Sequence, residues 1–377
     1  MEGTPQATAA TAAPPGGGAA VQPDLEVVEL SKRYGAQTVV DRVSFTLAPG
    51  EFVSILGPSG CGKTTTLRMI AGLEEASGGS IRIRGRDVTR LAPEKRNTAM
   101  VFQSYALFPH MNVLDNVAFG LRMRSVGKAE ARERAGAALE RARLVGFDDR
   151  RPSELSGGQR QRVAVARALV VEPDVLLLDE ALTNLDRRLR QDLQLELKRL
   201  QQELGITSLF VTHDQEEALT LSDRVIVMEE GRIAQVDEPS AVYDRPASVF
   251  VAGFIGESNR LAGRVSRRLE DGVCEVTTAE GQVVTGRGDA PVGAACAAVV
   301  RPRNISLAKQ PAPGLNCLPG TVLVWGYKGD SYEYVVDLEE GPQVKVMVPR
   351  REATAETGDA VFIVFDPADA YVLPGDA

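Results

Sequence analysis

Two kinds of hydrophobic pattern divide the chain into two regions. Between about residues 25 and 222, short apolar segments typical of buried strands alternate with longer segments whose apolar positions recur at a helical spacing. The strand-like segments include EFVSIL, VLLLDE, SLFVTHD and RVIVMEEGRI, whereas TTTLRMIAGLE and RRLRQDLQLELKRLQQEL have helical patterns. This alternation predicts an α/β core with a largely parallel sheet. The alternating charges of the helix predicted at 187–204 indicate a solvated amphipathic face.

The pattern changes after Pro246, where short strand-like segments are separated by Gly, Pro and Asp. This texture predicts a separate β-rich domain, most simply a small barrel. The junction falls near YDRPASVFVAGFIGESN, so the expected domains cover residues 25–245 and 246–377. Residues 1–24 are mostly Ala, Thr, Pro and Gly, without the basic start and apolar core of a secretory signal. We expect them to form a disordered tail.

Composition narrows the class of protein. With 377 residues, 44% hydrophobic and 25% charged, the chain has the content of a soluble globular protein of two domains. No segment approaches the roughly 18–20 apolar residues of a membrane span. The net charge of −8 argues against non-specific binding to nucleic acid or to anionic lipid. The four cysteines show neither metal-ligand nor disulfide spacing, which favours reduced thiols in a cytoplasmic protein.

A glycine-rich segment, ILGPSGCGKTTTLRMIAG, carries the first candidate site. Gly57, Gly62, Lys63 and Thr64 fit the template G-x-x-x-x-G-K-[ST], with a strand-like segment before and a helical one after. Backbone amides at such a helix start converge on an anion, so the loop predicts a phosphate cradle. Lys63 would reach the terminal phosphates, and Thr64 would offer its hydroxyl to Mg²⁺. The alternative is an ordinary glycine-rich turn.

A second candidate anion site lies in LSGGQRQRVAVARALVVEP. Ser156 stands at an N-cap position, two glycines follow, and a helix is expected from about Gln159. A plain serine cap with turn glycines would account for this segment alone. Since the first loop already covers one nucleotide's phosphates, a second anion-binding start makes sense if it closes over a nucleotide held by another copy.

Residues 25–245 resemble the ATP-binding subunits of ABC transporters. LSGGQ matches the signature motif, the first loop matches Walker A, and VLLLDE matches Walker B with Asp179 and Glu180 at its end. TNLD (residues 183–186) stands at the D-loop position, and Gln103, His213 and Tyr34 match the Q-loop glutamine, the switch histidine and the adenine-stacking aromatic. The resemblance implies ATP contacts at Tyr34, Gly57, Pro58, Ser59, Gly60, Cys61, Gly62, Lys63, Thr64, Thr65, Ser156, Gly157, Gly158, Gln159 and Asp186.

The resemblance also implies roles in hydrolysis. Thr64, Asp179 and Gln103 would hold Mg²⁺, with ATP as the nucleotide. Glu180 would act as general base, His213 would contact the γ-phosphate, and Gln103 would report nucleotide state to a partner. Where the family usually has proline after the catalytic glutamate, this chain has Ala181, which we expect to loosen the turn. Tyr34 could instead be a packing aromatic.

The implied assembly is a homodimer on two membrane-spanning permease subunits, at the cytoplasmic face of the inner membrane, served by an extracytoplasmic solute-binding protein and without nucleic acid. The segment SYALFPHMNVLDNVAFGL is the expected permease contact.

The region after residue 245 resembles the OB-like TOBE domain of importer ATPases, and YKGDSYEYVVDLEEG resembles the spermidine/putrescine branch. Importers of sugar, glycerol-phosphate, ferric iron or sulfate share this architecture.

Two other classes remain. A soluble ABC ATPase acting on nucleic acid or ribosomes would predict tandem cassettes or a coiled-coil insertion, and neither pattern is present. A regulatory module, in which the β-rich domain controls the ATPase, is compatible with transport. A GTPase is excluded by the lack of an Asn-Lys-x-Asp motif.

Overall fold

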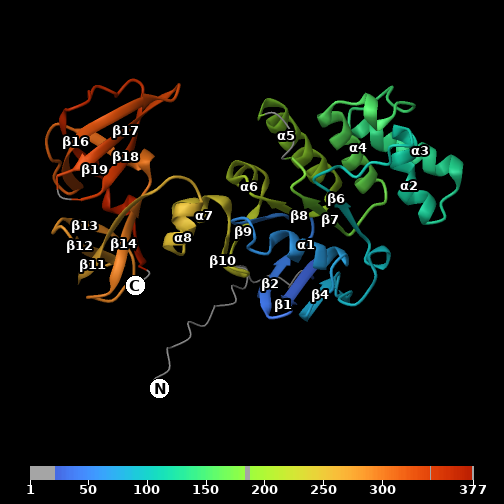
Figure 1. The fold of residues 1–377 in the computed structure, drawn as a ribbon, viewed down its shortest axis with the longest axis horizontal. Helices are drawn as coiled ribbons and strands as arrows, with labels where there is room; N and C mark the ends of the chain where they lie inside the picture. The colour runs from blue at the N-terminus through green and yellow to red at the C-terminus, as the bar shows by residue number, and fades with distance from the viewer. Residues whose placement is uncertain (1–21, 183–186, 340, 376–377) are drawn as a thin grey trace, which may run out of the picture.

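The central layer of the molecule is a six-stranded, mostly parallel sheet (Figure 1). The structure, a computed structural model, describes residues 22–182, 187–339 and 341–375. The strand order is β10-β9-β3-β8-β7-β6, and only β10 is antiparallel to its neighbour. Three strands are buried along their whole length, as the continuous apolar segments predict. The bounds are β3 (Phe52–Leu56), β6 (Thr98–Val101), β7 (Val175–Asp179), β8 (Thr207–Thr212), β9 (Arg224–Glu229) and β10 (Arg232–Asp237).

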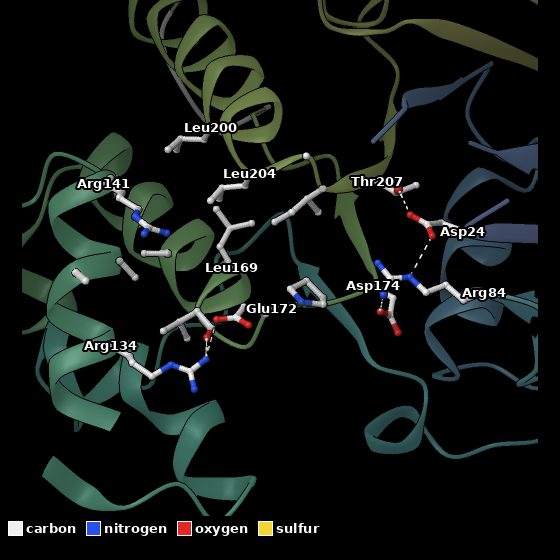
Figure 2. A pocket seen from close by; sticks show the side chains of 18 residues that line it. Asp24, Arg84, Arg134, Arg141, Leu169, Glu172, Asp174, Leu200, Leu204 and Thr207 are labelled. Atoms are coloured by element: carbon white, nitrogen blue, oxygen red, sulfur yellow. Dashed lines mark hydrogen bonds and ion pairs between the residues drawn. The ribbon is translucent and has the colours of Figure 1, made fainter. Parts of the chain in front are cut away.

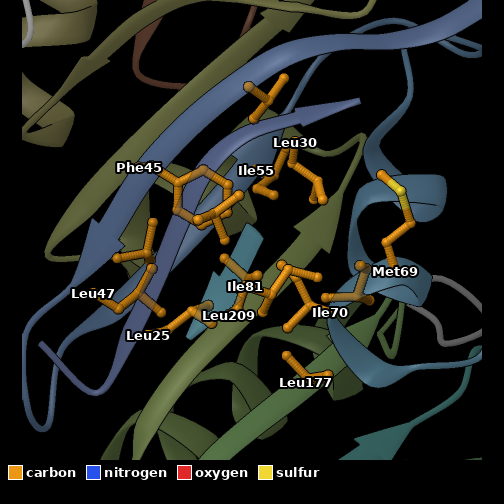
Figure 3. Close-up of a cluster of buried hydrophobic side chains, with 14 of the residues drawn as sticks. Leu25, Leu30, Phe45, Leu47, Ile55, Met69, Ile70, Ile81, Leu177 and Leu209 are labelled. Carbon is orange, nitrogen blue, oxygen red and sulfur yellow. The ribbon is translucent and has the colours of Figure 1, made fainter. Parts of the chain in front are cut away.

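A second, antiparallel sheet with the order β2-β1-β4-β5 covers helix α1 (Lys63–Ala71). Figure 3 shows the shared core, in which Leu30 and Phe45 of this sheet face Ile55 and Leu209 of the central sheet, with Met69 of α1 at the side. The sequence pattern did not separate this sheet from the α/β alternation. Its strands are β1 (Leu25–Tyr34), β2 (Gln37–Leu47), β4 (Gly78–Ile83) and β5 (Arg86–Asp87). The helix that follows the glycine-rich loop is therefore packed against both sheets.

A group of helices beside the central sheet forms a helical subdomain. Helices α2 (Val113–Met123), α3 (Lys128–Arg141) and α4 (Gly157–Leu169) share a buried cluster that includes Val117, Leu139 and Val163. Asn112 caps α2 and Ser156 caps α4, each accepting a hydrogen bond from a backbone N–H in the first turn.

Two further helices lie on the central sheet, α5 (Arg187–Leu204) and α6 (Gln215–Leu221). The interpretation of 187–204 as a solvated face describes only one side of α5. Its other side buries Leu193, Leu197 and Leu200 against Leu176 and Phe210 of the sheet. The helix is amphipathic because it covers a core.

The C-terminal region is a β-rich domain, as predicted. Strands β11, β12, β13, β20 and β14 close a barrel, and a second sheet with the order β15-β19-β16-β17-β18 shares its core through residues such as Leu261, Val336 and Ile363. The barrel strands are β11 (Asn259–Arg268), β12 (Val273–Thr278), β13 (Val283–Arg287), β14 (Ala295–Val300) and β20 (Ala370–Pro374). The sheet strands are β15 (Ser306–Ala308), β16 (Asn316–Tyr327), β17 (Ser331–Leu338), β18 (Gln343–Pro349) and β19 (Ala360–Phe365).

Two short helices, α7 (Pro239–Asp244) and α8 (Val249–Phe254), lie between the two regions in Figure 1. Helix α8 packs Val251 into the cluster that contains Val225 and Val227 of β9. It also packs Ala252 against Val299 of the barrel. The boundary predicted at residue 245 thus precedes a helix that contacts both regions.

Of the tail predicted over residues 1–24, residues 1–21 lie outside the described residues. Asp24 is described, and its placement corrects the end of that prediction. Its side chain is buried and accepts hydrogen bonds from Thr207 Oγ1 and Arg84 Nε. A buried, bonded carboxylate marks Asp24 as part of the folded region.

The described residues contain no helix that is both long and apolar enough to cross a membrane. All four cysteines lie in the described ranges, and none of them is part of a disulfide there.

A buried arginine secures the end of α1. Arg96 is 4% exposed, and its guanidinium donates hydrogen bonds to the carbonyls of Met69, Ile70, Leu91 and Thr89 at 2.7–3.0 Å. Burial lowers its pKa from the ordinary arginine value. Because the last carbonyls of a helix lack partners within it, Arg96 supplies a hydrogen bond to the Ile70 carbonyl and adds a second one to the Met69 carbonyl, which also accepts from the Gly72 N–H at 3.2 Å.

Replacing Arg96 with Met should therefore lower the free energy of unfolding by about 2–4 kcal/mol, since it leaves buried carbonyls unpaired. Arg82→Met is the matched control, because Arg82 makes a 3.1 Å ion pair with Glu26 and its side chain is 48% exposed. Its loss should cost at most about 0.5 kcal/mol. Urea unfolding of the two variants measures both values, and equal losses would contradict this role of Arg96.

Candidate active site

Four neighbouring parallel strands bring the predicted site residues to one edge of the central sheet. The glycine-rich loop follows β3, His213 follows β8, Glu180 follows β7, and Gln103 follows β6. Since parallel strands end at the same edge, residues far apart in the sequence meet there. The register pairs Leu56 with Thr212, and Asp179 with Val211.

The glycine-rich loop folds around the Lys63 ammonium. Its Nζ atom donates hydrogen bonds to the carbonyls of Gly57 (2.8 Å) and Pro58 (2.9 Å), and the side chain is buried. Gly62 caps α1 with a φ of 100°, which favours glycine. A Cβ on Gly57 would lie 2.4 Å from the Met228 carbonyl oxygen, so no larger residue fits. Ser59 and Gly60 form the exposed tip, whereas Cys61 is buried and Thr65 partly so.

Thr64 and Asp179 form a polar pair at the start of α1. The Thr64 hydroxyl donates to Asp179 Oδ1 at 3.3 Å. Burial raises the pKa of Asp179 above its usual range, while the charge of Arg68 and the Thr64 hydroxyl oppose that rise. A hydroxyl and a carboxylate are the hard oxygen ligands that Mg²⁺ prefers, so the pair fits a metal that also binds phosphate oxygens.

The Glu180 carboxylate is the point on which two predicted residues converge. Gln103 Nε2 donates to Glu180 Oε2 at 3.1 Å, and His213 Nδ1 lies 3.3 Å from Glu180 Oε1. Glu180 has a φ of 45°, an unusual backbone conformation for this residue type, and its N–H donates to the Val211 carbonyl at 2.9 Å. Ala181, the next residue, is buried, and the looser turn expected from the missing proline stays a prediction. Fixed backbone strain of this kind is found where surrounding contacts determine it.

Tyr34 lies at the end of β1 with 49% of its surface exposed. The Lys32 ammonium stands 4.8 Å from its ring centroid. Because about half of the residue's surface is accessible, Tyr34 has room for a stacking partner, and its adenine-stacking role stays a prediction beside the packing alternative.

The LSGGQ turn lies at the N-terminus of α4, in the helical subdomain (Figure 1). Ser156 Oγ accepts from the Gln159 N–H at 3.3 Å, and Gln159 Oε1 accepts from the Ser156 N–H at 2.9 Å. Among the described residues, no hydrogen bond or ion pair joins residues 156–159 to residues 57–65. One chain therefore presents two separate candidate anion sites. Asp186 and the rest of TNLD lie outside the described residues.

The sequence analysis missed a network of hydrogen bonds among the residues next to His213. Glu217 is fully buried, and its carboxylate accepts a hydrogen bond from Thr212 Oγ1 at 2.5 Å. Arg190 Nη1 donates to Asp214 Oδ2 at 3.0 Å. Burial raises the pKa of Glu217 above its usual range. The spacing of Glu217, four residues after His213 and at the start of a helix, was the available signal.

A cavity of about 450 Å³ lies at the opposite edge of the sheet (Figure 2). Its lining includes Leu169, Leu200 and Leu204, with Arg134 and Arg141 from α3 on one side. Because Thr207 begins β8 and Asp174 directly precedes β7, this hollow is separate from the edge that carries Glu180.

Comparison with known proteins agrees with this geometry. The ABC transporter family model matches residues 40–183, and the TOBE domain model matches residues 298–373.

Among curated proteins, the chain is 48% identical to the Fe(3+) ions import ATP-binding protein FbpC of Agrobacterium fabrum, over 90% of this chain and 95% of the relative. It is 46% identical to the spermidine/putrescine import ATP-binding protein PotA of Acidothermus cellulolyticus, over 93% and 94%. It is 47% identical to the PotA of Rubrobacter xylanophilus, over 93% and 94%.

With matching models for both regions and relatives that align over nearly the whole length, the chain belongs to the ABC transporter family as an ATP-binding protein with a C-terminal TOBE domain.

Proposed function

We propose that the protein is the ATP-hydrolysing subunit of an importer and that it couples hydrolysis to solute uptake through separate permease subunits. One observation carries the proposal: the glycine-rich loop, Asp179, Glu180, Gln103 and His213 meet at one edge of a parallel sheet. Phosphoryl transfer needs positioning and charge neutralisation more than covalent chemistry, and this edge offers both.

The phosphate end of the nucleotide binds to the loop of residues 57–65. Backbone N–H groups at the start of α1 and the Lys63 ammonium supply positive charge to the phosphate oxygens. Thr64 and Asp179 hold Mg²⁺, with Gln103 as a further ligand close by. The metal neutralises charge on the phosphates when it is bound. Tyr34 provides the exposed ring on which adenine stacks.

Glu180 is the general base in this proposal. Its carboxylate orients the attacking water and accepts the proton, while Gln103 and His213 hold the carboxylate from two sides. The exposed side of His213 is available to the γ-phosphate, since 55% of its side chain is accessible.

The active unit is a homodimer. The LSGGQ turn is exposed at Ser156 and belongs to a helix start, where anions bind favourably. Since it does not contact the glycine-rich loop of its own chain, it closes over the nucleotide of a second copy.

The permease docks on the segment that follows Gln103. Ala106, Pro109 and His110 are exposed there, while Arg167 of α4 donates to the carbonyls of Tyr105 (2.9 Å) and Ala106 (2.7 Å). This link joins the nucleotide edge to the helical subdomain. The subunit then lies at the cytoplasmic face of the membrane.

A polyamine is the proposed solute, on the resemblance of YKGDSYEYVVDLEEG and on the relatives named for spermidine and putrescine import. Ferric iron is the second candidate, because a relative named for Fe(3+) import is 48% identical. The solute itself is held by the binding protein and the permease, and nucleic acid has no part in the activity.

Glu180→Gln tests the general base. The amide keeps the size of the side chain but cannot accept a proton, so hydrolysis should fall by about 10²–10⁴ while ATP binding survives. Asp179→Asn should weaken ATP binding as well, since it removes a charged metal ligand. Glu216→Gln, on an exposed glutamate of α6, is the matched control and should hydrolyse normally. A near-normal rate for Glu180→Gln would move the base elsewhere, with His213 as the first alternative.

Mixed dimers test the composite site. Lys63→Ala should lose ATP binding and Ser156→Arg should lose hydrolysis, so neither variant alone is active. Mixing them should restore roughly a quarter of normal activity, because half of the dimers are mixed and one of their two sites is intact. If the mixture neither hydrolyses ATP nor holds ATP in its mixed dimers, the site is not shared between two copies.

The complete transporter in lipid vesicles tests the solute. Binding protein loaded with spermidine should raise its ATPase rate, and the same protein without solute should not. Stimulation by a ferric-loaded binding protein from the same source, without a response to spermidine, would assign the protein to iron import.

A further inference from the structure

Gln215 joins the turn that carries His213 to the segment between the two regions of the chain. It is the first residue of α6 and lies two positions after His213. Its Oε1 atom accepts a hydrogen bond from the Gly256 N–H at 2.8 Å, and its Nε2 atom donates to the Phe254 carbonyl. One amide group therefore engages both a donor and an acceptor of the backbone that leaves α8.

Arg301 holds the same segment from the side of the β-rich domain. It directly follows β14 and is 4% exposed. Its Nη1 atom donates to the carbonyls of Ala252 (2.8 Å) and Glu257 (3.2 Å) and lies 3.5 Å from the Gly256 carbonyl. Its Nη2 atom donates to the Tyr243 carbonyl at 2.7 Å. Residues 252–257 are thus bonded to Gln215 on one side and to Arg301 on the other.

The turn that carries His213 is held by hydrogen bonds of the residues on both sides of the histidine. Thr212 is fully buried, and its hydroxyl accepts from the Asp214 N–H at 3.0 Å and donates to Glu217. Asp214 in turn caps α6 by accepting from the Glu217 N–H. Because the residues on both sides of His213 are fixed, a shift of Gln215 moves the imidazole relative to Glu180.

We propose that Gln215 is a positioning residue through which the β-rich domain, by way of Arg301 and residues 252–257, sets the place of His213 against Glu180. The inference rests on the proposed role of His213 in hydrolysis. When a ligand or a partner changes the position of the β-rich domain against residues 252–257, the rate of hydrolysis changes while the glycine-rich loop stays as it is. The coupling runs in both directions, as any equilibrium linkage must.

Hydrogen exchange tests the connection without measuring activity. In the full-length protein, Arg301→Met should make the amides of residues 212–217 exchange about two- to thirty-fold faster, the usual range for coupled sites. Arg303→Met is the matched control, since Arg303 also stacks on Tyr243, at 4.7 Å, and should leave these amides unchanged. The reciprocal variant is Gln215→Leu, which should make the amides of residues 252–257 exchange faster.

Kinetics test the consequence for catalysis. Gln215→Leu should lower kcat about two- to thirty-fold with little change in the affinity for ATP. Gln191→Leu is the control. Gln191 lies in α5 and donates a hydrogen bond to the exposed Glu216, the neighbour of Gln215 in α6, at 3.2 Å. In the described structure it forms no hydrogen bond with the segment 252–257. The double variant Gln215→Leu/Arg301→Met should be no slower than the slower single variant, because both act on one route.

Three results separate the possible failures. Unchanged exchange at residues 212–217 in Arg301→Met, together with unchanged exchange at 252–257 in Gln215→Leu, overturns the connection. Normal kcat in Gln215→Leu overturns its positioning role. If His213→Ala hydrolyses ATP normally while the exchange effects persist, the connection stands and the proposed role of His213 is wrong.

Discussion

The parallel pairing of β3, β8, β7 and β6 is the constraint on which the site depends. Each strand brings the residues at or just beyond its end to the same edge, so the glycine-rich loop, a carboxylate pair, a histidine and a glutamine meet without being close in sequence. Three of them, β3, β7 and β8, are buried along their whole length, whereas β6 is mostly half-buried. A shift of one residue in a fully buried strand would exchange the side chains packed on its two faces and would move its site residue along the edge.

The same constraint explains where strain and buried charge collect. Asp179 ends a fully buried strand, so its carboxyl group loses water and its pKa rises. Glu180 then turns the chain out of the sheet with a positive φ, and contacts from two neighbouring segments, the one after β6 and the end of β8, hold it there. Backbone strain of this kind costs stability locally, and the packed clusters beside it offset that cost.

Local patterns in the sequence predicted much of this fold and the elements that carry the candidate site residues. The glycine-rich loop, the caps of α4 and the strands around VLLLDE and SLFVTHD were found where expected, because each depends on neighbouring residues in the chain. Features that depend on distant residues were missed. The antiparallel sheet pairs β1 with β4 across the whole phosphate loop, and the bonds of Gln215 to residues near 255 have no local signal. Asp24 was assigned to the tail because its partner, Thr207, is distant in the sequence.

The closure of the C-terminal barrel bears on how the protein is made. Strand β20, at residues Ala370–Pro374, fills the gap between β13 and β14, which are complete some seventy residues earlier in the chain. During synthesis the edges of β13 and β14 stay open until the roughly seventy residues that separate β14 from β20 have been made, whereas the glycine-rich loop region is complete earlier. Open strand edges are a hazard for mispairing between chains. Two copies translated from one messenger would expose such edges at the same time, so the five-residue strand β20 also decides whether each barrel closes on itself.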